Sequence, residues 1–222
     1  MCGRISQDVD LENFFVKVDW DVFWRPQPGT RLKFNVPPGT TPLVLHDAGG
    51  TLTVDRVFWG YKPVWYKRGP VSNARLDTVL KGSGFWKPLL ERRVLVPARG
   101  WYEWTGEKGD KQPWFICAKD AQPILMAGIS AWKSGQETSK ETGFAIVTDD
   151  AAGGMVDIHD RRPVCLTPDN ARAWLDPDTG TNDVLDLLST PRPESAFQWW
   201  EVTRAVGNSR YQGADSAEPI KK

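Results

Sequence analysis

The pattern of apolar and polar residues predicts many short β-strands. Apolar runs rich in branched and aromatic side chains recur at fairly regular intervals from residue 42 onward. Such frequent short runs favour an antiparallel or mixed β core over alternating β/α units. Strands are expected at residues 42–45, 52–59, 93–97, 113–118, 124–129, 144–148, 164–166 and 199–202.

Helical signals are fewer and lie mainly late in the chain. Residues 10–18 carry apolar side chains at helical spacing, and the proline-rich segment that follows is expected to be looped. Two further helices are predicted at residues 167–175, with Thr167 or Asp169 as N-cap, and at residues 182–188. The expected fold class is therefore α+β, a mostly antiparallel or mixed, barrel-like β core with a few peripheral helices.

Length and loop composition predict one domain. The 222 residues are 40% hydrophobic, enough for a single ordinary core, and no internal repeat or linker interrupts them. The polar segments 105–112 and 133–142 are expected to connect hairpins. Residues 1–212 are predicted to form the domain, with 213–222 as a flexible C-terminal tail that frays from Gly213 onward.

Targeting signals and cysteine spacing restrict the functional classes. No apolar run reaches the roughly 18 to 20 residues of a membrane span, and the first fifteen residues are too acidic for a signal peptide. We therefore expect a cytoplasmic protein without a membrane partner. Three widely spaced cysteines suggest neither a disulfide framework nor a metal site, and no cofactor is expected.

The charge balance argues weakly against a nucleic-acid binder. Twenty-eight basic and twenty-eight acidic residues give a formal net charge of zero. This excludes only indiscriminate attraction of the whole surface to phosphate, because a neutral protein can still contain a local basic groove. The twelve tryptophans are expected to be mostly core, and a few at the surface could stack on nucleobases.

Cys2 is the first candidate for chemistry. A small residue at position two normally permits removal of the initiator methionine, which would leave an amine and a thiol on one carbon skeleton. Reference pKa values of about 7.7–8.0 for an α-amine and about 8.5 for a thiol leave a share of each nucleophilic near neutral pH. With an aldehyde, the amine forms a Schiff base and the thiol then closes a five-membered thiazolidine. The alternative is that Cys2 is simply a terminal residue.

Three further segments contain polar residues that are hard to explain as core. They are SNARLDT with Asn73, PARGWYEW with Glu103, and IHDRRPV with His159. Each has a structural explanation, because Asn73 can shape a turn, Glu103 can face solvent from a strand, and His159 can be a hydrogen-bonded structural residue. Together with the Cys2 thiol, however, they form the nucleophile, orienter and acid/base set of carbonyl chemistry. His46 follows an apolar strand and precedes DAGG, so we interpret it as a surface turn residue.

The ordered segments MCGR, FNVPP, WGYKPVW, NARLDT, PARGWYEW, AGISAW and IHDRRPV carry a family likeness. With them the chain resembles the SOS-response-associated peptidase (SRAP) family, whose members act on abasic sites in DNA. The likeness extends from Cys2 to about Val202. It implies a mostly β single-domain fold, a positively lined cleft for single-stranded DNA, and covalent capture of the abasic deoxyribose by the mature N-terminal cysteine.

The resemblance also implies a role for each matching catalytic residue. Cys2 would supply amine and thiol, and Asn73 would hold the N-terminus and the sugar. Glu103 would move protons during ring opening and closure, with His159 as a second acid/base group. The partner would be single-stranded DNA containing abasic sites, bound by a monomer.

DNA contacts follow from the same likeness. Three arginines would hold the phosphates that flank the lesion, two tryptophans would stack on or beside bases, and one threonine would line the pocket. These residues are Arg4, Arg75 and Arg161, then Trp65 and Trp104, and Thr148. Stacking contributes about 1 to 3 kcal/mol per base, so such a cleft needs no global positive charge. It predicts salt-dependent binding.

Three positions depart from the family pattern. Arg162 stands where methionine is usual, Asp77 replaces a glutamate, and Phe34 replaces a tyrosine. Arg162 either adds a DNA phosphate contact or extends its charged end outward. Asp77 is one methylene shorter than glutamate and could weaken a bond to Arg75.

Two other functional classes stay open on the sequence alone. Class II glutamine amidotransferases also begin with Met-Cys-Gly and use the thiol as nucleophile, although Arg4 stands where isoleucine is usual and no synthase domain follows. A peptidase that removes its own leader is a related possibility. A non-enzymatic domain that binds single-stranded DNA would leave Glu103 and His159 unexplained.

Overall fold

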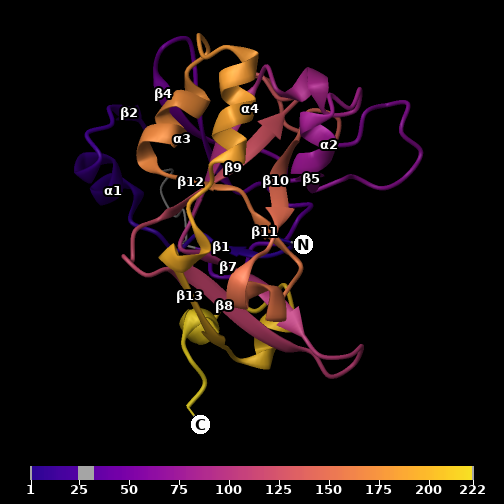
Figure 1. Ribbon diagram of the computed structural model, residues 1–222, viewed down its shortest axis with the longest axis vertical. Coiled ribbons are helices and arrows are strands. Elements are labelled where there is room, and N and C mark those ends of the chain that lie inside the picture. Colours follow the sequence, from indigo (N-terminus) through magenta and orange to yellow (C-terminus); the bar gives the residue numbers. More distant parts are fainter. Residues whose placement is uncertain (1, 25–32, 222) are drawn as a thin grey trace.

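Two β-sheets packed face to face form the core of the structure, a computed structural model that describes residues 2–24 and 33–221 (Figure 1). The smaller sheet has the order β1 (Ile5–Ser6), β7 (Gly100–Thr105), β8 (Gln112–Ala118) and β13 (Phe197–Glu201). The neighbouring strands of this sheet pair antiparallel. The expected α+β class is confirmed, with a β core that is mostly antiparallel.

The larger sheet contains the other strands of the described chain. Its order is β11 (Arg161–Pro163), β10 (Phe144–Asp150), β9 (Ile124–Ser130), β6 (Arg93–Ala98), β3 (Leu43–Asp47), β4 (Leu52–Arg56) and β2 (Val22–Phe23). Two short strands lie off this path: β12 (Cys165–Leu166) pairs with β9, and β5 (Asn73–Arg75) pairs with β10 in parallel.

The larger sheet is covered on both faces, which explains its nearly continuous apolar strands. On β6, Val94 and Val96 face the core between the two sheets, whereas Leu95 faces the opposite core. This alternation is the period of two that a pleated strand imposes. Because one face of the sheet meets the second sheet and the other meets helices, both sets of side chains are apolar.

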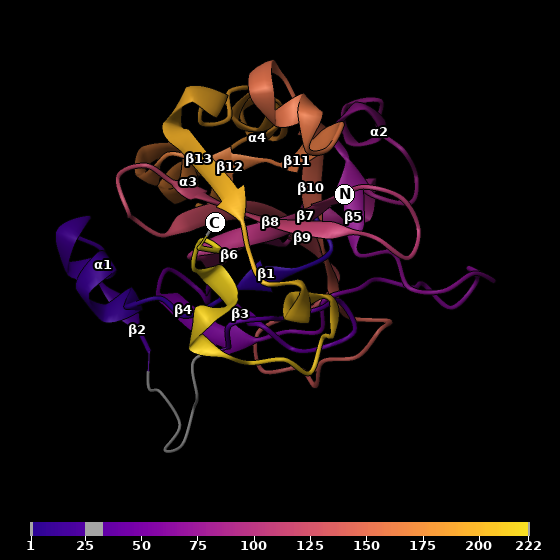
Figure 2. The same cartoon turned by 90° about the horizontal axis from the view of Figure 1, so that it is seen from below.

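The helices cover the outer face of the larger sheet. They are α1 (Leu11–Lys17), α2 (Leu76–Leu80), α3 (Pro168–Leu175) and α4 (Thr181–Ser189), and each contributes buried side chains to the same apolar cluster. Of the two N-cap candidates, Thr167 and Asp169, it is Thr167 that caps α3, by accepting the Asn170 amide at 3.3 Å. Figure 1 shows α3 and α4 together in the upper part of the view, away from β7, β8 and β13, and Figure 2 gives the view from below, in which β13 overlaps these helices.

The C-terminal segment is packed, contrary to the predicted frayed tail. Ala214–Ala217 form a 3₁₀ turn in which Ser216 and Ala217 are buried. The Trp200 indole donates to the Ala217 carbonyl at 3.0 Å, and the Ile220 amide donates to the Glu201 carbonyl at 3.1 Å. The segment therefore covers the outer face of the smaller sheet, whose side chains would otherwise be exposed.

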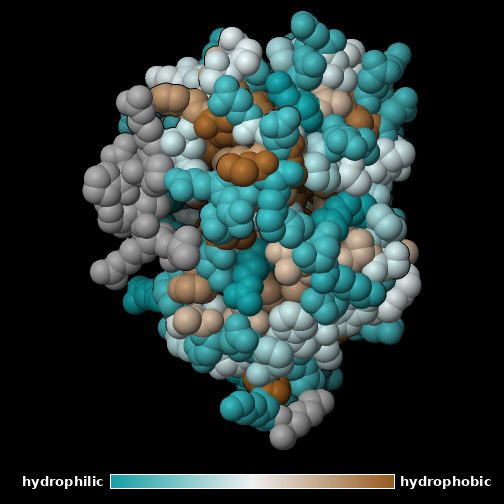
Figure 3. Space-filling model, turned by 90° about the vertical axis from the view of Figure 1, so that its left-hand side faces the viewer, coloured by the Kyte–Doolittle hydropathy of each residue, from teal (hydrophilic) through white to brown (hydrophobic). Residues whose placement is uncertain are grey.

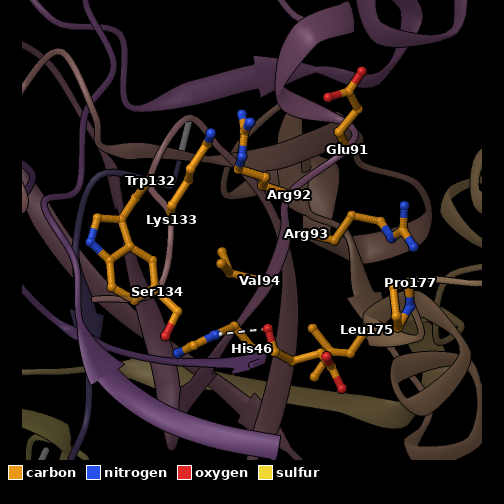
Figure 4. A pocket seen from close by; sticks show the side chains of 11 residues that line it. His46, Glu91, Arg92, Arg93, Val94, Trp132, Lys133, Ser134, Leu175 and Pro177 are labelled. Atoms are coloured by element: carbon orange, nitrogen blue, oxygen red, sulfur yellow. Dashed lines mark hydrogen bonds between the residues drawn. The ribbon is translucent and has the colours of Figure 1, made fainter. Parts of the chain in front are cut away.

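The sequence suggested that His46 is a surface turn residue, and the structure shows that this interpretation is wrong. His46 lies in β3 and is 4% exposed, with Nε2 2.8 Å from Asp55 on β4 and Nδ1 3.1 Å from the Asp47 carbonyl. It borders a cavity of about 230 Å³ together with Trp132 and Arg93 (Figure 4). Arg93 donates to the carbonyls of Leu90, Trp174 and Asp176, so the polar groups of both residues serve the fold.

The surface has only scattered large apolar side chains among the described residues. They are Val16, Phe23, Val64, Trp65, Leu80, Val156 and Ile220. On the face shown in Figure 3, hydrophilic residues cover most of the surface and the apolar residues gather mainly in the upper half. None of the helices within residues 2–24 and 33–221 is long and apolar enough to cross a membrane.

Candidate active site

Cys2 lies in the core between the two sheets, with its side chain fully buried. The chain start runs antiparallel to β7: Ile5 pairs with Trp101, and the Arg4 carbonyl accepts the Tyr102 amide at 2.9 Å. This register directs Cys2 toward the second half of β7, where Glu103 lies. Burial, followed by the nearby Glu103 carboxylate, raises the pKa of the Cys2 thiol well above its usual value.

Glu103 is a carboxylate inside the fold. On β7, Trp101 faces the core between the sheets and Tyr102 the opposite side, so the alternation places the Glu103 side chain with Trp101. Glu103 is 3% exposed, and burial raises its pKa from 4.5 to about 7. Near neutral pH this carboxyl group is therefore able both to donate and to accept a proton.

His159 faces Glu103 from another segment. Its Nε2 lies 3.9 Å from Glu103 Oε2, and burial lowers the pKa of the imidazole. The preceding 3₁₀ turn, Gly153–Asp157, is held by Glu194, whose carboxylate accepts the amides of Ala152 at 2.9 Å and Met155 at 2.7 Å. The His159 amide in turn donates to the Met155 carbonyl at 3.0 Å. This chain of bonds orients the imidazole toward the buried carboxyl group.

Asn73 is positioned by the parallel pairing of β5 with β10. Its neighbour Ala74 pairs with Val147, and both lie in the helix-covered cluster, so Asn73 faces the opposite side of the sheet. Its Nδ2 donates to Ser72 Oγ at 3.2 Å. Its Oδ1 is buried and has no hydrogen-bond partner in the described part of the chain. Because an unpaired buried acceptor is costly, this oxygen is suited to a donor supplied by a ligand or an amine.

Arg161 and Thr148 form one unit beside Asn73. The Arg161 guanidinium donates from Nη2 to the Thr148 carbonyl at 2.7 Å and to Thr148 Oγ1 at 3.3 Å, and from Nη1 to Asp150 at 2.7 Å. Thr148 is fully buried and pairs with Arg75 of β5. The Arg161 Nε is buried and has no partner among residues 2–24 and 33–221, so one donor remains for a ligand.

Arg4 and Arg162 are engaged with the protein. Arg4 Nη1 donates to Asn35 Oδ1 at 2.7 Å and to the Val206 carbonyl at 2.9 Å, while its guanidinium lies 5.5 Å from the centre of the Trp104 ring. Arg162 is 8% exposed and donates to the Arg192 carbonyl at 3.0 Å. The Arg162 side chain therefore does not extend outward.

Arg75 and Trp65 are the two predicted DNA contacts that are exposed. Arg75 forms a two-bond pair with Asp77, at 2.9 and 3.1 Å, so the shorter acid still reaches the guanidinium. Trp65 is 64% exposed and lies edge-on to Tyr66 and Phe85, at ring-centre distances of 6.0 and 5.7 Å. The Trp65 indole is therefore packed against two neighbouring rings while much of its surface stays accessible to solvent.

The comparisons with known proteins agree with the motifs. Residues 1–209 match the family described as SOS response associated peptidase (SRAP). The chain belongs to the SRAP family. No group of three or more His, Cys, Asp or Glu side chains in the described part of this SRAP chain could hold a metal ion.

Individual relatives extend the match over the whole chain. The SRAP chain is 39% identical to "Abasic site processing protein YedK" of Escherichia coli over 99% of its own length and 100% of that protein. It is 28% identical to "Abasic site processing protein YoaM" of Bacillus subtilis, over 97% and 96% of the two chains. The solved structure of a phage-related protein from Bordetella bronchiseptica is 39% identical, covers both chains fully and superposes with a TM-score of 0.77.

Sequence reasoning on this SRAP chain missed two residues that shape the site. Asp160 Oδ1 lies 2.7 Å from His159 Nδ1, and its position directly after the histidine was an available signal. Glu194 is linked to the His159 loop only through the fold, 39 and 42 residues from the amides that it accepts, so no local pattern identifies it.

Proposed function

We propose that this SRAP chain recognises abasic sites in single-stranded DNA and joins itself covalently to them through Cys2. The observation that carries the proposal is a buried thiol at the start of the chain beside a carboxyl group of raised pKa and an imidazole. The relatives named as abasic site processing proteins support the choice of substrate. The proposal requires removal of Met1, because the Cys2 amine is otherwise part of a peptide bond.

The proposed reaction joins three groups and releases one water. The Cys2 amine adds to C1′ of the ring-opened deoxyribose, and loss of the aldehyde oxygen as water gives an imine. The Cys2 sulfur then bonds to the imine carbon, and the thiol proton moves to nitrogen, which closes the thiazolidine. The high pKa of the buried thiol favours this order, because a neutral thiol is a weaker first nucleophile than an unprotonated amine.

Glu103 and His159 would move the protons of these steps. A carboxyl group with a pKa of about 7 can accept a proton from the adding amine and later protonate the departing hydroxyl. The imidazole, 3.9 Å away, can take up or return that proton. The unpaired Oδ1 of Asn73 would accept a hydrogen bond from the Cys2 amine or a sugar hydroxyl.

The adduct itself tests the function. Purified protein incubated with a single-stranded oligonucleotide that carries one abasic site is expected to give a protein–DNA band on a denaturing gel. An otherwise identical oligonucleotide with an intact base should give none. Absence of the band with protein shown by mass to lack Met1 would refute the proposal, whereas ammonia release from glutamine would favour an amidotransferase-like function.

Arg75 and Asp77 offer a prediction about DNA affinity. Replacing Asp77 by Asn frees the exposed Arg75 guanidinium and removes a negative charge, so affinity for undamaged single-stranded DNA should rise, by up to about fivefold at low salt. Arg75→Ala should weaken binding and lower the slope of log affinity against log salt by about 0.7. Fluorescence anisotropy over a salt series measures both effects.

Asp186→Asn is the matched control for this prediction. Asp186 is an exposed aspartate on α4, over the face of the larger sheet that points away from the site. It should leave both affinity and salt slope unchanged. Equal affinity gains from Asp77→Asn and Asp186→Asn would mean that general charge, and not the Arg75 pair, governs binding.

A further inference from the structure

We propose that residues 192–194 form a clamp that positions His159 for proton exchange with the buried carboxyl group. The clamp is remote from His159 in the sequence, yet it is bonded to the chain on both sides of this histidine. Glu194 accepts backbone amides that precede the histidine. The Arg162 side chain, which follows the histidine, donates to the Arg192 carbonyl. The inference deepens the proposed function, and its activity readout rests on that function.

The 3₁₀ turn that precedes His159 has no cap of its own. Ala152 occupies its N-cap position, and an alanine side chain has no oxygen that could accept the free amides of the first turn. The Glu194 carboxylate supplies both acceptors from a remote segment. Its Oε2 accepts the Ala152 amide at 2.9 Å, and its Oε1 accepts the Met155 amide at 2.7 Å. Hydrogen bonds to a charged acceptor are about twice as strong as neutral ones, so these two bonds fix the start of the turn.

The backbone carries the hold of Glu194 to His159. The φ of Gly153 is +55°, a conformation that favours glycine, and a Cβ atom here would lie 2.8 Å from Glu194 Oε1. Glycine therefore allows the close approach of the carboxylate. Met155 is 1% exposed and packs in the same apolar cluster as Cys2, and its carbonyl accepts the His159 amide at 3.0 Å. Glu194 thus acts on the histidine through the Met155 backbone.

The clamp is itself fixed to the sheets. The Arg192 amide donates to the Cys165 carbonyl of β12 at 2.7 Å, and the Arg192 guanidinium donates to Asp120, between β8 and β9, at 2.9 Å. Arg162 is 8% exposed and donates to the Arg192 carbonyl at 3.0 Å. A methionine, which is usual at position 162 in the family, could not make this bond. Arg162 therefore ties the strand after the histidine to the clamp.

The geometry at the imidazole makes its position decisive. The Arg161 amide of β11 donates to His159 Nδ1 at 3.0 Å, and His159 Nε2 lies 3.9 Å from Glu103 Oε2. Proton exchange needs about 2.6–3.2 Å between heavy atoms, and a misplacement of about 1 Å can slow a reaction about a hundredfold. The clamp is therefore expected to control the rate of the chemical step and not the binding of DNA.

Amide hydrogen exchange tests the clamp without DNA. Glu194→Ala removes both acceptors, so the amides of Met155 and His159 should exchange at least about tenfold faster than in the wild type. Glu194→Gln keeps one acceptor oxygen and should give intermediate rates. Asp47→Ala is the matched control, because the Asp47 carboxylate accepts the Gly50 amide at 2.8 Å in the β3–β4 hairpin, and it should leave both rates unchanged. Unchanged exchange at His159 in Glu194→Ala overturns the inference.

A double-mutant cycle gives the functional readout. At saturating abasic single-stranded DNA, Glu194→Ala should crosslink about tenfold to a hundredfold more slowly than the wild type, because His159 is displaced. In a His159→Ala background the same change should alter the rate by less than about twofold, because the clamp acts through the imidazole. Equal slowing in both backgrounds would mean general damage to the fold and would overturn the inference.

Arg162→Met separates positioning from DNA binding. It removes the bond to the Arg192 carbonyl, so the crosslinking rate at saturating DNA should fall by about threefold or more. Affinity for undamaged single-stranded DNA and its salt slope should stay as in the wild type, unlike in Arg75→Ala. A lower affinity with a smaller salt slope would assign Arg162 to phosphate binding and overturn its part in the clamp. If the wild type forms no adduct, the proposed function fails, and amide exchange still decides whether the clamp holds His159.

Discussion

Cys2→Ser protein is expected to lose the adduct that survives denaturation, although it keeps the amine. The serine hydroxyl is a poor nucleophile toward the imine, so the reaction should stop at a Schiff base, which water reverses. Reduction with borohydride during the reaction should trap that imine and restore a band on the gel. The yield without reductant should fall at least about a hundredfold, because covalent catalysis is lost.

A second cysteine provides the control for this result. Cys117 lies in β8 and is largely buried in a different apolar cluster from Cys2, so Cys117→Ser changes a thiol away from the site. It should crosslink at the wild-type rate. Survival of the unreduced band in Cys2→Ser, or its loss in Cys117→Ser, would show that the thiol of Cys2 does not close the ring.

Glu103→Gln is expected to slow crosslinking and to stabilise the fold. General acid–base catalysis by one side chain contributes roughly 10² to 10⁴ in rate, so the observed rate should fall within that range. The carboxyl pKa is about 7 in the fold against 4.5 in the unfolded chain. Above pH 7 the folded state must hold a buried negative charge. The rise in the Glu103 pKa from 4.5 to about 7 then corresponds to a loss of roughly 3 kcal/mol in the free energy of unfolding.

The sign of this stability effect follows from the raised pKa. Below pH 4.5 Glu103 is neutral in both the folded and the unfolded chain. As the pH rises from 4.5 to 7 the unfolded chain releases this proton and the folded chain keeps it, so the free energy of unfolding falls. Glutamine carries no charge, so Glu103→Gln should unfold at higher denaturant concentration than the wild type at pH 8 and at a similar concentration at pH 4. Glu107→Gln, at an exposed position of the following turn, should match the wild type at both pH values. A destabilised Glu103→Gln at pH 8 would contradict this account of the site.

The sequence predicted those strands whose apolar residues are consecutive. The expected strands at residues 93–97, 113–118 and 124–129 lie within one or two residues of β6, β8 and β9. By contrast, β7 was not predicted, although it carries Glu103. Its sequence GWYEWT does not alternate between apolar and polar, because Trp101 and Tyr102 are buried in different cores on its two faces.

Short strands and buried polar groups depend on distant partners, which a local pattern does not contain. The three residues of β5 become a strand only by pairing with β10, more than seventy positions later. His46 looked like a turn residue because its partner Asp55 belongs to the next strand, on the opposite side of a tight hairpin. Each assignment required the register between strands, and hence the structure.

For the site, residue types were predictable but their environments were not. The polar segments and the chain start identified Cys2, Asn73, Glu103 and His159, the family resemblance implied their roles, and the structure places a buried thiol and a 3.9 Å carboxyl–imidazole contact among them. The sequence did not indicate that Arg161 is bonded to Thr148 and Asp150, or that Arg4 is bonded to Asn35. Burial and hydrogen bonding set these properties through contacts that are remote in sequence.

The mass of the adduct tests the central claim most directly. Protein crosslinked to an abasic oligonucleotide without reductant should have the mass of the chain lacking Met1 plus that of the oligonucleotide, less one water. Proteolysis followed by fragmentation should locate the nucleotide on Cys2. An adduct that retains Met1, or one attached to a lysine, would contradict the account.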